Sequence, residues 1–436
     1  MKVPALRIIT LSAFIALLAT AAPAQNAITF WNSIAVQTAI TGKASSGGSG
    51  IFLAYSNLAA FDAVNAIHPR FQSYGGIQPT ASPDSSESAA VAAAVHDVLV
   101  HYFPAQAASD PTATPPFVGL DERYANYLTA LTGSAAAIND GVLVGQRTAA
   151  NLIALRANDG VFGVNTYVFQ TPGPGVYQPT PPFPYTGPLT PWIANMTPFT
   201  MSSAGQFLPD EGPTPLSTQE WAADYNRTKA WGALTNSLRR PEQTTIALFW
   251  TANPGAAFNS MLTDLVSRRS LSTLNSARLF AMVFSGYGDA FIGCMNAKYH
   301  FNFWRPVTAI QEGDIDGNPD TVGDPNWLPL ANTPTHPEYP AAHGCVTGAV
   351  TSVVASYFGA PNLTLHVTVT YAIPPALGGG TQTATRTFRS TKELLKEVQM
   401  ARIYGGMHFH HSVVQGGLLG QKVAHNLVEN YFQPLK

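Results

Sequence analysis

The chain has 436 residues, enough for one large domain or two modest ones with real cores. Apolar residues make up 46% of it and charged residues 11%, which indicates a folded globular protein and excludes a disordered one. The formal net charge of -2 excludes a broadly basic nucleic-acid-binding protein and an acidic tail.

Residues 1–24 have the pattern of an export signal. Lys2 and Arg7 give a positive start, a mostly apolar run follows from Ile8 to Ala21, and Ala22-Pro23-Ala24 matches a cleavage site. The run is too short for a comfortable membrane span. We therefore expect an exported protein, periplasmic or secreted, that leaves the membrane when the signal is cleaved. An uncleaved anchor is the alternative.

Residues 25–216 are expected to form an N-terminal helical region that ends in a proline-rich segment. Apolar residues recur at helical spacing in Ile51–Ile67 and Ala89–Tyr102. The run Ser45–Gly50 contains only Ser and Gly and predicts a loop. Prolines crowd residues 171–216, which predicts a long irregular segment that wraps the surface and separates the two halves of the chain.

Residues 217–436 are expected to form a C-terminal helical bundle that carries the chemistry. Ser217 and Ser390 each begin a Ser-x-x-Glu pattern typical of a helix start. We expect helices at 217–236, 241–253, 255–270, 275–299, 390–404 and 411–432. Alternating β-branched residues on either side of three glycines predict a small β-hairpin near 363–388. Gly416, Gly417 and Gly420 would let a neighbouring helix approach the last helix closely.

Three clusters in this region carry residues suited to chemistry, and the first is Lys298–Pro306. Lys298 and Arg305 are seven residues apart, which on a helix is two turns and places both cations on one face, roughly 10 Å apart. The aromatic residues between them favour a binding site over the alternative, a helix face with two solvated cations.

The second cluster is His336-Pro337-Glu338-Tyr339-Pro340-Ala341-Ala342-His343-Gly344. Pro340 suits the first position of a helix running to about Phe358. The backbone N–H groups of Ala341, Ala342 and His343 would then lack helical partners and form an anion site. His343 beside it is placed to exchange a proton with a bound oxyanion. A capping histidine without chemistry is the alternative.

The third cluster, residues 402–412, contains Arg402, which offers two hydrogen bonds to an oxyanion. His408, His410 and His411 also admit a zinc site, although no acidic or sulfur ligand lies nearby in the sequence. If the clusters converge, their three cations repel one another unless an anion sits between them. The sequence therefore predicts an oxyanion pocket.

The two cysteines lie close to these clusters. Cys294 is four residues before Lys298, and Cys345 is two residues after His343. Convergence of the clusters would bring the sulfur atoms together, and export would permit a disulfide. Two buried free thiols are the alternative.

The clusters resemble the signature of the vanadium-dependent haloperoxidases and the related type-2 phosphatidic acid phosphatases. That signature is a Lys, six residues and Arg-Pro; then Pro-Ser-Gly-His; then Ser-Arg, five residues and His. The corresponding residues, in the same order, are Lys298, Arg305-Pro306, Pro340-Ala341-Ala342-His343, Ala401-Arg402 and His408. Three further segments, Phe61-Asp62-Ala63, residues 156–160 and residues 175–179, resemble sequences of the bacterial haloperoxidase-like branch.

The resemblance implies a mainly α fold of two helical bundles with vanadate as cofactor, in a site that phosphate could also occupy. His408 would be the metal ligand, or the nucleophile of a phosphatase. Catalysis would further involve His343, as general acid–base, and Lys298, which polarises bound peroxide. The oxyanion-binding residues would be Lys298, Arg305, Arg402 and, through backbone N–H groups, Ala341 and Ala342.

Several positions depart from the family pattern. Ala341 and Ala342 stand for Ser and Gly, and the lost hydroxyl donor weakens oxyanion binding by on the order of 1–3 kcal/mol unless it is replaced. Ser412 stands where many relatives have an Asp four residues after the histidine, which counts against a phosphatase. His336 occupies a halide-selectivity position that is Phe in chloroperoxidase-type and His in bromoperoxidase-type members, which favours bromide or iodide.

Three functions follow from these observations. The first is an exported vanadate-dependent haloperoxidase that uses hydrogen peroxide, a halide and a small organic acceptor. The second is an acid phosphatase that acts through a phosphohistidine in the same pocket. The third is an inactive oxyanion-binding relative. A homo-oligomer is compatible with each.

Overall fold

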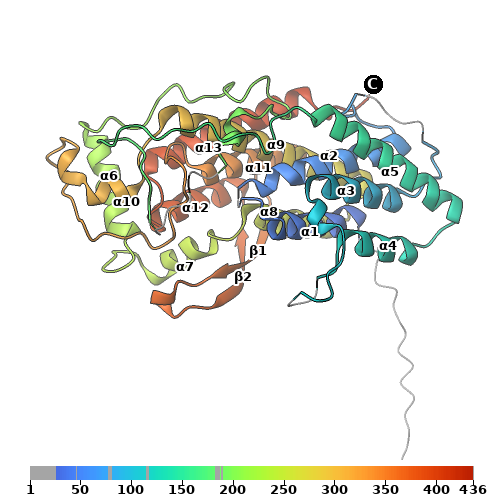
Figure 1. The fold of residues 1–436 in the computed structure, drawn as a ribbon, viewed down its shortest axis with the longest axis horizontal. Coiled ribbons are helices and arrows are strands. Elements are labelled where there is room, and N and C mark those ends of the chain that lie inside the picture. Colours follow the sequence, from blue (N-terminus) through green and yellow to red (C-terminus); the bar gives the residue numbers. More distant parts are fainter. Residues whose placement is uncertain are drawn as a thin grey trace, which may run out of the picture.

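The computed structural model describes residues 26–435, apart from residues 46, 77–80, 114–116, 182–186 and 188–189. Helices dominate these residues (Figure 1). The helices before the proline-rich segment are α1 (Ala27–Thr41), α2 (Ser49–Ile67), α3 (Glu87–Tyr102), α4 (Leu120–Ala130) and α5 (Ala135–Arg156). Those after it are α6 (Gln219–Gly232), α7 (Pro241–Phe249), α8 (Pro254–Arg269), α9 (Thr273–Phe301), α10 (Pro306–Gln311), α11 (Ala342–Tyr357), α12 (Thr391–Tyr404) and α13 (His410–Asn430).

The expected mainly α fold with one small hairpin is confirmed. Strands β1 (Leu365–Ala372) and β2 (Thr381–Phe388) pair antiparallel, with Leu365 opposite Phe388. One face of β1 is buried, since its residues alternate between buried and more exposed along the strand. The expected export signal, residues 1–24, lies outside the described residues and stays a prediction.

The starts of α6 and α2 are among those that differ from the sequence prediction. Thr218, not Ser217, caps α6, because its extended backbone lets the hydroxyl accept a hydrogen bond from the Trp221 N–H at 3.1 Å. The predicted Ser45–Gly50 loop is wrong at its end, because Ser49 and Gly50 begin α2. Gly50 is required there, since a Cβ atom would lie 2.0 Å from the Tyr287 ring of α9. Ser390 caps α12 as expected.

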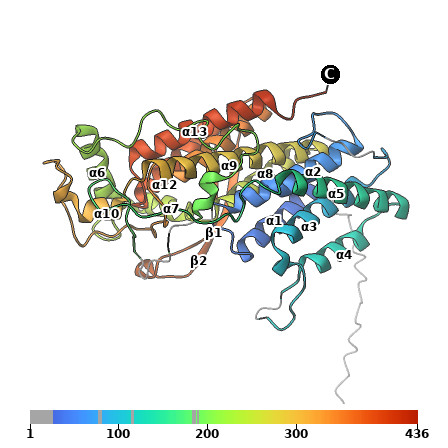
Figure 2. The same ribbon diagram turned by 45° about the horizontal axis from the view of Figure 1, so that its top comes forward.

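Helix α2 lies in the core, beside α9. All its residues are buried, and Gly288 of α9 approaches Ala54 of α2 (Figure 2). Among the described residues α2 is the one helix long and apolar enough to cross a membrane, and its complete burial is that of a core helix. The regions before and after the proline-rich segment share one continuous hydrophobic core, and their division into domains stays a prediction.

The described parts of the proline-rich segment contain no α-helix, as expected, and only a short 3-10 helix, Pro191–Asn195. The segment is hydrogen-bonded to α9 and to the residues that follow α9. The carboxylate of Asp289 accepts backbone N–H bonds from Phe199, Thr200 and Met201. The segment therefore crosses the long central helix α9.

Helices α11 and α13 pack with their backbones in contact. A Cβ atom on Gly420 would lie 2.0 Å from the carbonyl oxygen of Cys345, and one on Gly348 would lie 2.4 Å from that of Gly417. The close approach expected from the glycines of the last helix is confirmed. It fixes the start of α11 against the start of α13, where two of the three clusters lie.

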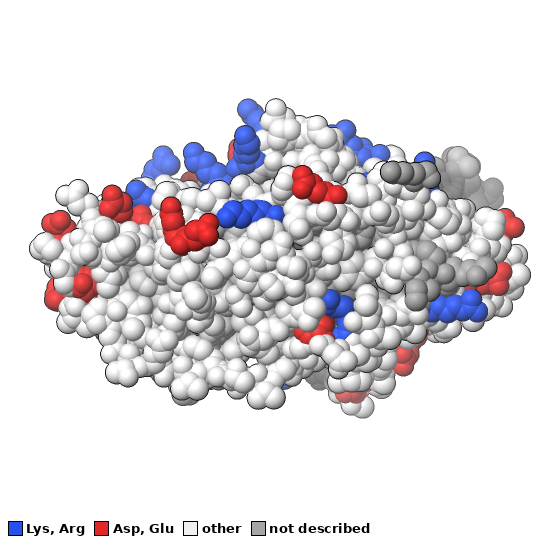
Figure 3. Space-filling model, turned by 90° about the horizontal axis from the view of Figure 1, so that it is seen from above, with Lys and Arg blue, Asp and Glu red and all other residues white. Residues whose placement is uncertain are grey.

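Charged side chains are sparse on the surface. Figure 3 shows small groups of both signs on a largely uncharged face.

We predict that Gly420→Ala lowers the free energy of unfolding by about 2 kcal/mol or more, because the new methyl group has to push apart two backbones. Denaturant unfolding measures this. Gly417→Ala is the matched control on the same helix, since its methyl group meets only the flexible end of Gln399. A Gly420→Ala protein as stable as the Gly417→Ala protein would disprove the backbone contact.

Candidate functional site

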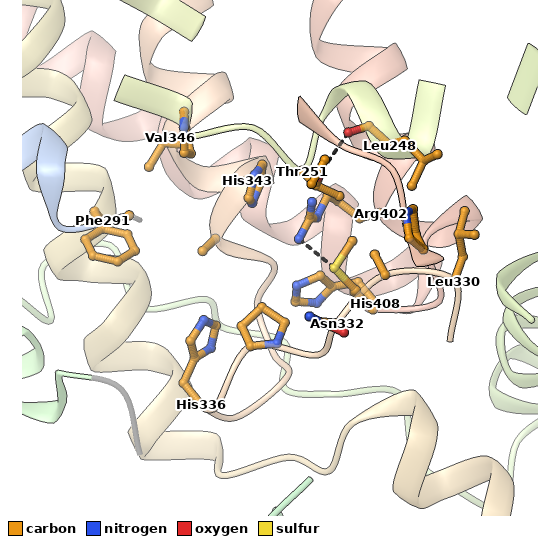
Figure 4. A pocket seen from close by; sticks show the side chains of 18 of the residues that line it. Leu248, Thr251, Phe291, Leu330, Asn332, His336, His343, Val346, Arg402 and His408 are labelled. Atoms are coloured by element: carbon orange, nitrogen blue, oxygen red, sulfur yellow. Dashed lines mark hydrogen bonds between the residues drawn. The ribbon is translucent and has the colours of Figure 1, made fainter. Parts of the chain in front are cut away.

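The second and third clusters line one cavity of about 510 Å³. Figure 4 shows His336, His343, Arg402 and His408 together around its centre. Lys298 and Arg305 of the first cluster are completely buried and are not among the residues that line the cavity. Of the three cations expected around the pocket, Arg402 is thus at its surface and the other two lie behind its wall.

Lys298 and Arg305 do not share a helix face, so that prediction is wrong. Helix α9 ends at Phe301, and Asn302 takes a left-handed conformation (φ 49°) that turns the chain. Arg305 then caps α10. The Lys298 Nζ donates to the carbonyl oxygens of Pro337 and Glu338, at 2.9 and 2.8 Å. Lys298 thereby binds the second cluster on the side away from the cavity, and Arg305 binds it through the His336 carbonyl oxygen.

Arg305 joins the second cluster to the third. Its Nε donates to the carbonyl oxygen of His336 at 2.8 Å, and its Nη1 donates to that of Met407 at 3.0 Å. The same Nη1 lies 3.2 Å from Nε2 of His408, and Nη2 lies 2.9 Å from Nδ1 of His336. Since a guanidinium only donates, Nε2 of His408 accepts and carries no proton. Nδ1 of His336 also lies 3.1 Å from the carbonyl oxygen of Pro337.

Glu338 is the functional residue that sequence reasoning missed. Its Oε1 lies 2.9 Å from Nδ1 of His408 and accepts the N–H of Phe409 at 3.0 Å. The His408 ring is therefore held at both nitrogens, with its proton on Nδ1 and a lone pair on Nε2. Burial raises the pKa of Glu338 to about 7, while Lys298 and Arg305 oppose that rise.

The sequence contained a signal for this carboxylate, because Glu338 lies inside the second cluster. Acidic residues are almost never fully buried unless they are paired. In many members of the family that the clusters resemble, the acid stands at the position of Ser412. Ser412 is buried there, and its side chain lowers the pKa of Glu338. The carboxylate is thus supplied by the segment before α11.

His408 and His343 are both kept neutral. Burial and the charges of Arg305, Lys298 and Arg402 lower the pKa of His408 well below its usual value. Burial and the charges of Arg402 and Lys298 do the same for His343, against a hydrogen bond to the Trp250 backbone. The His343 Nε2 is buried and has no hydrogen-bond partner among the described residues. It is thus available to a ligand in the cavity.

The start of α11 differs from the prediction by two residues. Pro340 precedes the helix, Ala341 is its N-cap and Ala342 its first residue. The Ala341 N–H donates to the carbonyl oxygen of Ser412 at 3.1 Å, so its predicted role in oxyanion binding is wrong. The N–H groups of Ala342, His343 and Gly344 have no partner within the helix and remain for an anion.

Arg402 presents an unsatisfied donor to the same region. Its Nη1 donates to the Trp250 carbonyl oxygen at 3.1 Å and its Nη2 to the Met407 sulfur at 3.0 Å. Its buried Nε has no partner among the described residues. Burial and the charge of Arg305 lower the pKa of Arg402 to about 9, which leaves it cationic at neutral pH. The donors and cations together fit a tetrahedral oxyanion such as vanadate or phosphate.

The third-cluster histidines do not converge on a zinc site. The His411 ring bonds the Gly212 carbonyl oxygen and its backbone N–H bonds Asp224, away from the cavity. Within the described ranges, no three His, Cys, Asp or Glu side chains are grouped to hold a metal ion. Cys294 and Cys345 do meet, as a hydrogen-bonded pair of buried free thiols without a disulfide.

Comparisons with known proteins find a family match in the C-terminal part of the chain. Residues 278–436 match the family model described as the VCPO second helical-bundle domain. The chain is 31% identical over 152 residues to the vanadium chloroperoxidase of Curvularia inaequalis, an alignment covering 29% of this chain and 24% of that protein. The match thus spans about a quarter of that relative's length.

Two solved structures resemble the fold over most of the chain. A bacterial vanadium-dependent iodoperoxidase has a TM-score of 0.74 at 20% identity and covers 94% of this chain and 97% of its own. An apo-type bacterial vanadium-dependent chloroperoxidase has a TM-score of 0.67 at 15% identity and covers 88% and 94%. At these identities the likeness shows the fold, and it confirms the expected fold class.

We predict that Arg402→Gln weakens binding of vanadate or phosphate at least about tenfold, since a charge-assisted hydrogen bond to a buried anion contributes ~1.5–3 kcal/mol. Titration calorimetry on vanadate-free protein measures this. Arg268→Gln, which breaks an outer ion pair with Asp264, is the control and should bind as the wild type does. Equal affinity in both variants would place the anion elsewhere.

Proposed function

Because the chain belongs to the superfamily of the vanadium-dependent haloperoxidases, we propose that it is an exported vanadate-dependent haloperoxidase that oxidises bromide or iodide with hydrogen peroxide. The relatives named above support the class of reaction. The choice of halide, export and the acceptor are the proposal's finer parts. Export follows from the pattern of residues 1–24.

The observation that carries the proposal is the state of the His408 ring. Glu338 fixes the proton on Nδ1, and the Nε2 lone pair lies among buried cations beside the cavity. A neutral, oriented imidazole nitrogen is what a metal oxyanion needs as a protein ligand. His408 would therefore hold vanadate through Nε2, and Glu338 would maintain the orientation of the ring.

The other residues divide the remaining work. Arg402 and the N–H groups at the start of α11 would bind the oxyanion's oxygen atoms. The unpartnered Nε2 of His343 would hold or release a proton at the cavity surface. Lys298 and Arg305 would supply positive charge from behind the wall. When bound, vanadate supplies a Lewis acid that makes peroxide electrophilic toward halide.

The halide preference rests on His336. Its ring lines the cavity. In the family resemblance this position is Phe in chloroperoxidase-type members and His in bromoperoxidase-type members, which supports bromide or iodide.

The phosphatase alternative loses one objection and gains no support. Glu338 supplies the carboxylate that Ser412 lacks, so the absence of an acid at position 412 no longer argues against a nucleophilic His408. The relatives named above, however, are haloperoxidases. Phosphate-ester hydrolysis therefore enters the assay as the competing outcome.

We predict that the protein brominates a phenolic dye only when vanadate, peroxide and bromide are all present, and that His408→Ala abolishes this activity. The control is His425→Ala, an exposed histidine of α13 paired with Glu429, which should keep full activity. Hydrolysis of a chromogenic phosphate ester that vanadate inhibits would favour the phosphatase. Anion binding without either activity would favour an inactive relative.

A second prediction tests Glu338 as a positioning residue. Glu338→Ala should lower bromination about 10- to 100-fold, the usual cost of losing the partner of a ligating histidine. Glu338→Gln retains an acceptor oxygen for His408 and should recover part of the loss. Glu242→Gln, at an exposed ion pair with Arg386, should have no effect. If the Gln and Ala variants lost activity equally, orientation of the ring would not be the role of Glu338.

A further inference from the structure

The cavity is larger than its oxyanion site requires. Its volume of about 510 Å³ falls in the ~300–1,000 Å³ range of pockets that hold drug-sized ligands. Besides the polar groups already described, it is lined mainly by apolar side chains from α7, α9, α11 and the end of β1. Vanadate, peroxide and a halide are small polar or ionic species that do not require an apolar surface of this extent.

Apolar residues lie on both sides of the polar centre of the cavity. Figure 4 shows Phe291 and Val346 to one side of His343, and Leu248 and Leu330 beside Arg402 on the other. A ligand that lies against Phe291 and Val346 would therefore have one edge next to the oxyanion site. That placement suits a molecule that receives a group from the site.

The Phe291 side of the cavity presents aromatic rings. Tyr287 and Phe291 follow each other by one turn of α9, with ring centroids 6.5 Å apart and an interplanar angle of 44°. The Tyr287 hydroxyl donates to the Gly47 carbonyl oxygen at 3.1 Å, so its hydrogen-bonding capacity is already used. Both residues line the cavity, where rings favour a flat, aromatic ligand.

The charge of the lining limits the ligand further. No Asp, Glu or Lys is among the residues that line the cavity within the described chain, and Arg402 is the one permanent charge there. The start of α11 adds a positive dipole end. A cationic ligand would find no counter-charge in this lining. A phenolate would face the positive charge of Arg402, and a neutral aromatic ligand needs no counter-charge.

The hairpin supplies one wall of this space. Ala372 ends β1, and Ile373, Pro374 and Pro375 follow it, all of them lining the cavity. Two prolines stiffen the wall. The strand is anchored outside the cavity by the Thr368 N–H, which donates to the Ser260 hydroxyl at 3.0 Å.

We propose that the cavity binds a neutral or anionic electron-rich aromatic acceptor, and that residues 372–375 form the wall that selects it. The proposal rests on the haloperoxidase function. The hypohalous acid formed at the oxyanion site transfers its halogen to a ring carbon. The ring C–H bond breaks, a C–halogen bond forms, and the released proton joins the hydroxide of the acid to leave as water.

The test compares Ala372→Trp, which fills the cavity from the exposed end of β1, with Leu377→Trp. Leu377 lies in the same connection, is exposed and does not line the cavity. With 2-naphthol as acceptor, Ala372→Trp should raise the apparent KM at least tenfold, and Leu377→Trp should match the wild type. Iodide oxidation without acceptor is the reference rate in each variant. Equal KM values in all three proteins would overturn the proposal.

Direct binding separates this proposal from the proposed function. Calorimetric titration of 2-naphthol into vanadate-free protein, without peroxide or halide, should show one saturable site that is lost in Ala372→Trp and kept in Leu377→Trp. Such binding in a protein that does not halogenate would support the aromatic site and refute the haloperoxidase. Halogenation without saturable binding, with the product isomers of free hypobromite, would support the enzyme and refute the site.

Discussion

The site depends on one electrostatic constraint, three buried cations served by a single buried carboxylate. Lys298, Arg305 and Arg402 are at most 2% exposed, and Glu338 is the acid among them. Glu338 cannot neutralise three charges, so the balance favours an anion in the cavity. Burial lowers the pKa of His343 and of His408, and the same excess of positive charge lowers both further, which keeps the two rings neutral. The buried cations therefore favour both anion binding and an unprotonated Nε2 on His408.

The backbone makes this arrangement rigid. The glycine contacts between α11 and α13 fix the start of one helix against the other, and the Ala341 N–H to Ser412 carbonyl bond closes the same junction. Lys298 and Arg305 bind the carbonyl oxygens of the segment before α11. Pre-organised donors of this kind contribute to catalysis without moving during the reaction.

The sequence predicted most of the elements, because helical periodicity, capping residues and alternating β-branched residues are local signals. It predicted the cations and histidines of the site from their spacing. It failed at three places. Asn302 turns the chain before Arg305, the Ser412 carbonyl oxygen accepts the Ala341 N–H, and Glu338 reaches His408 across 70 positions. The last two are contacts between distant segments, and no local pattern predicts which atoms meet.

The Glu338–His408 contact also bears on how such proteins are recognised. A search pattern that demands an acid four residues after the histidine would discard this chain, although the imidazole has its carboxylate. In this chain the acid comes from the segment before α11. Classification of distant homologues by linear motifs would gain from asking which atom faces the imidazole nitrogen, and from accepting any stretch of chain that brings a carboxylate there.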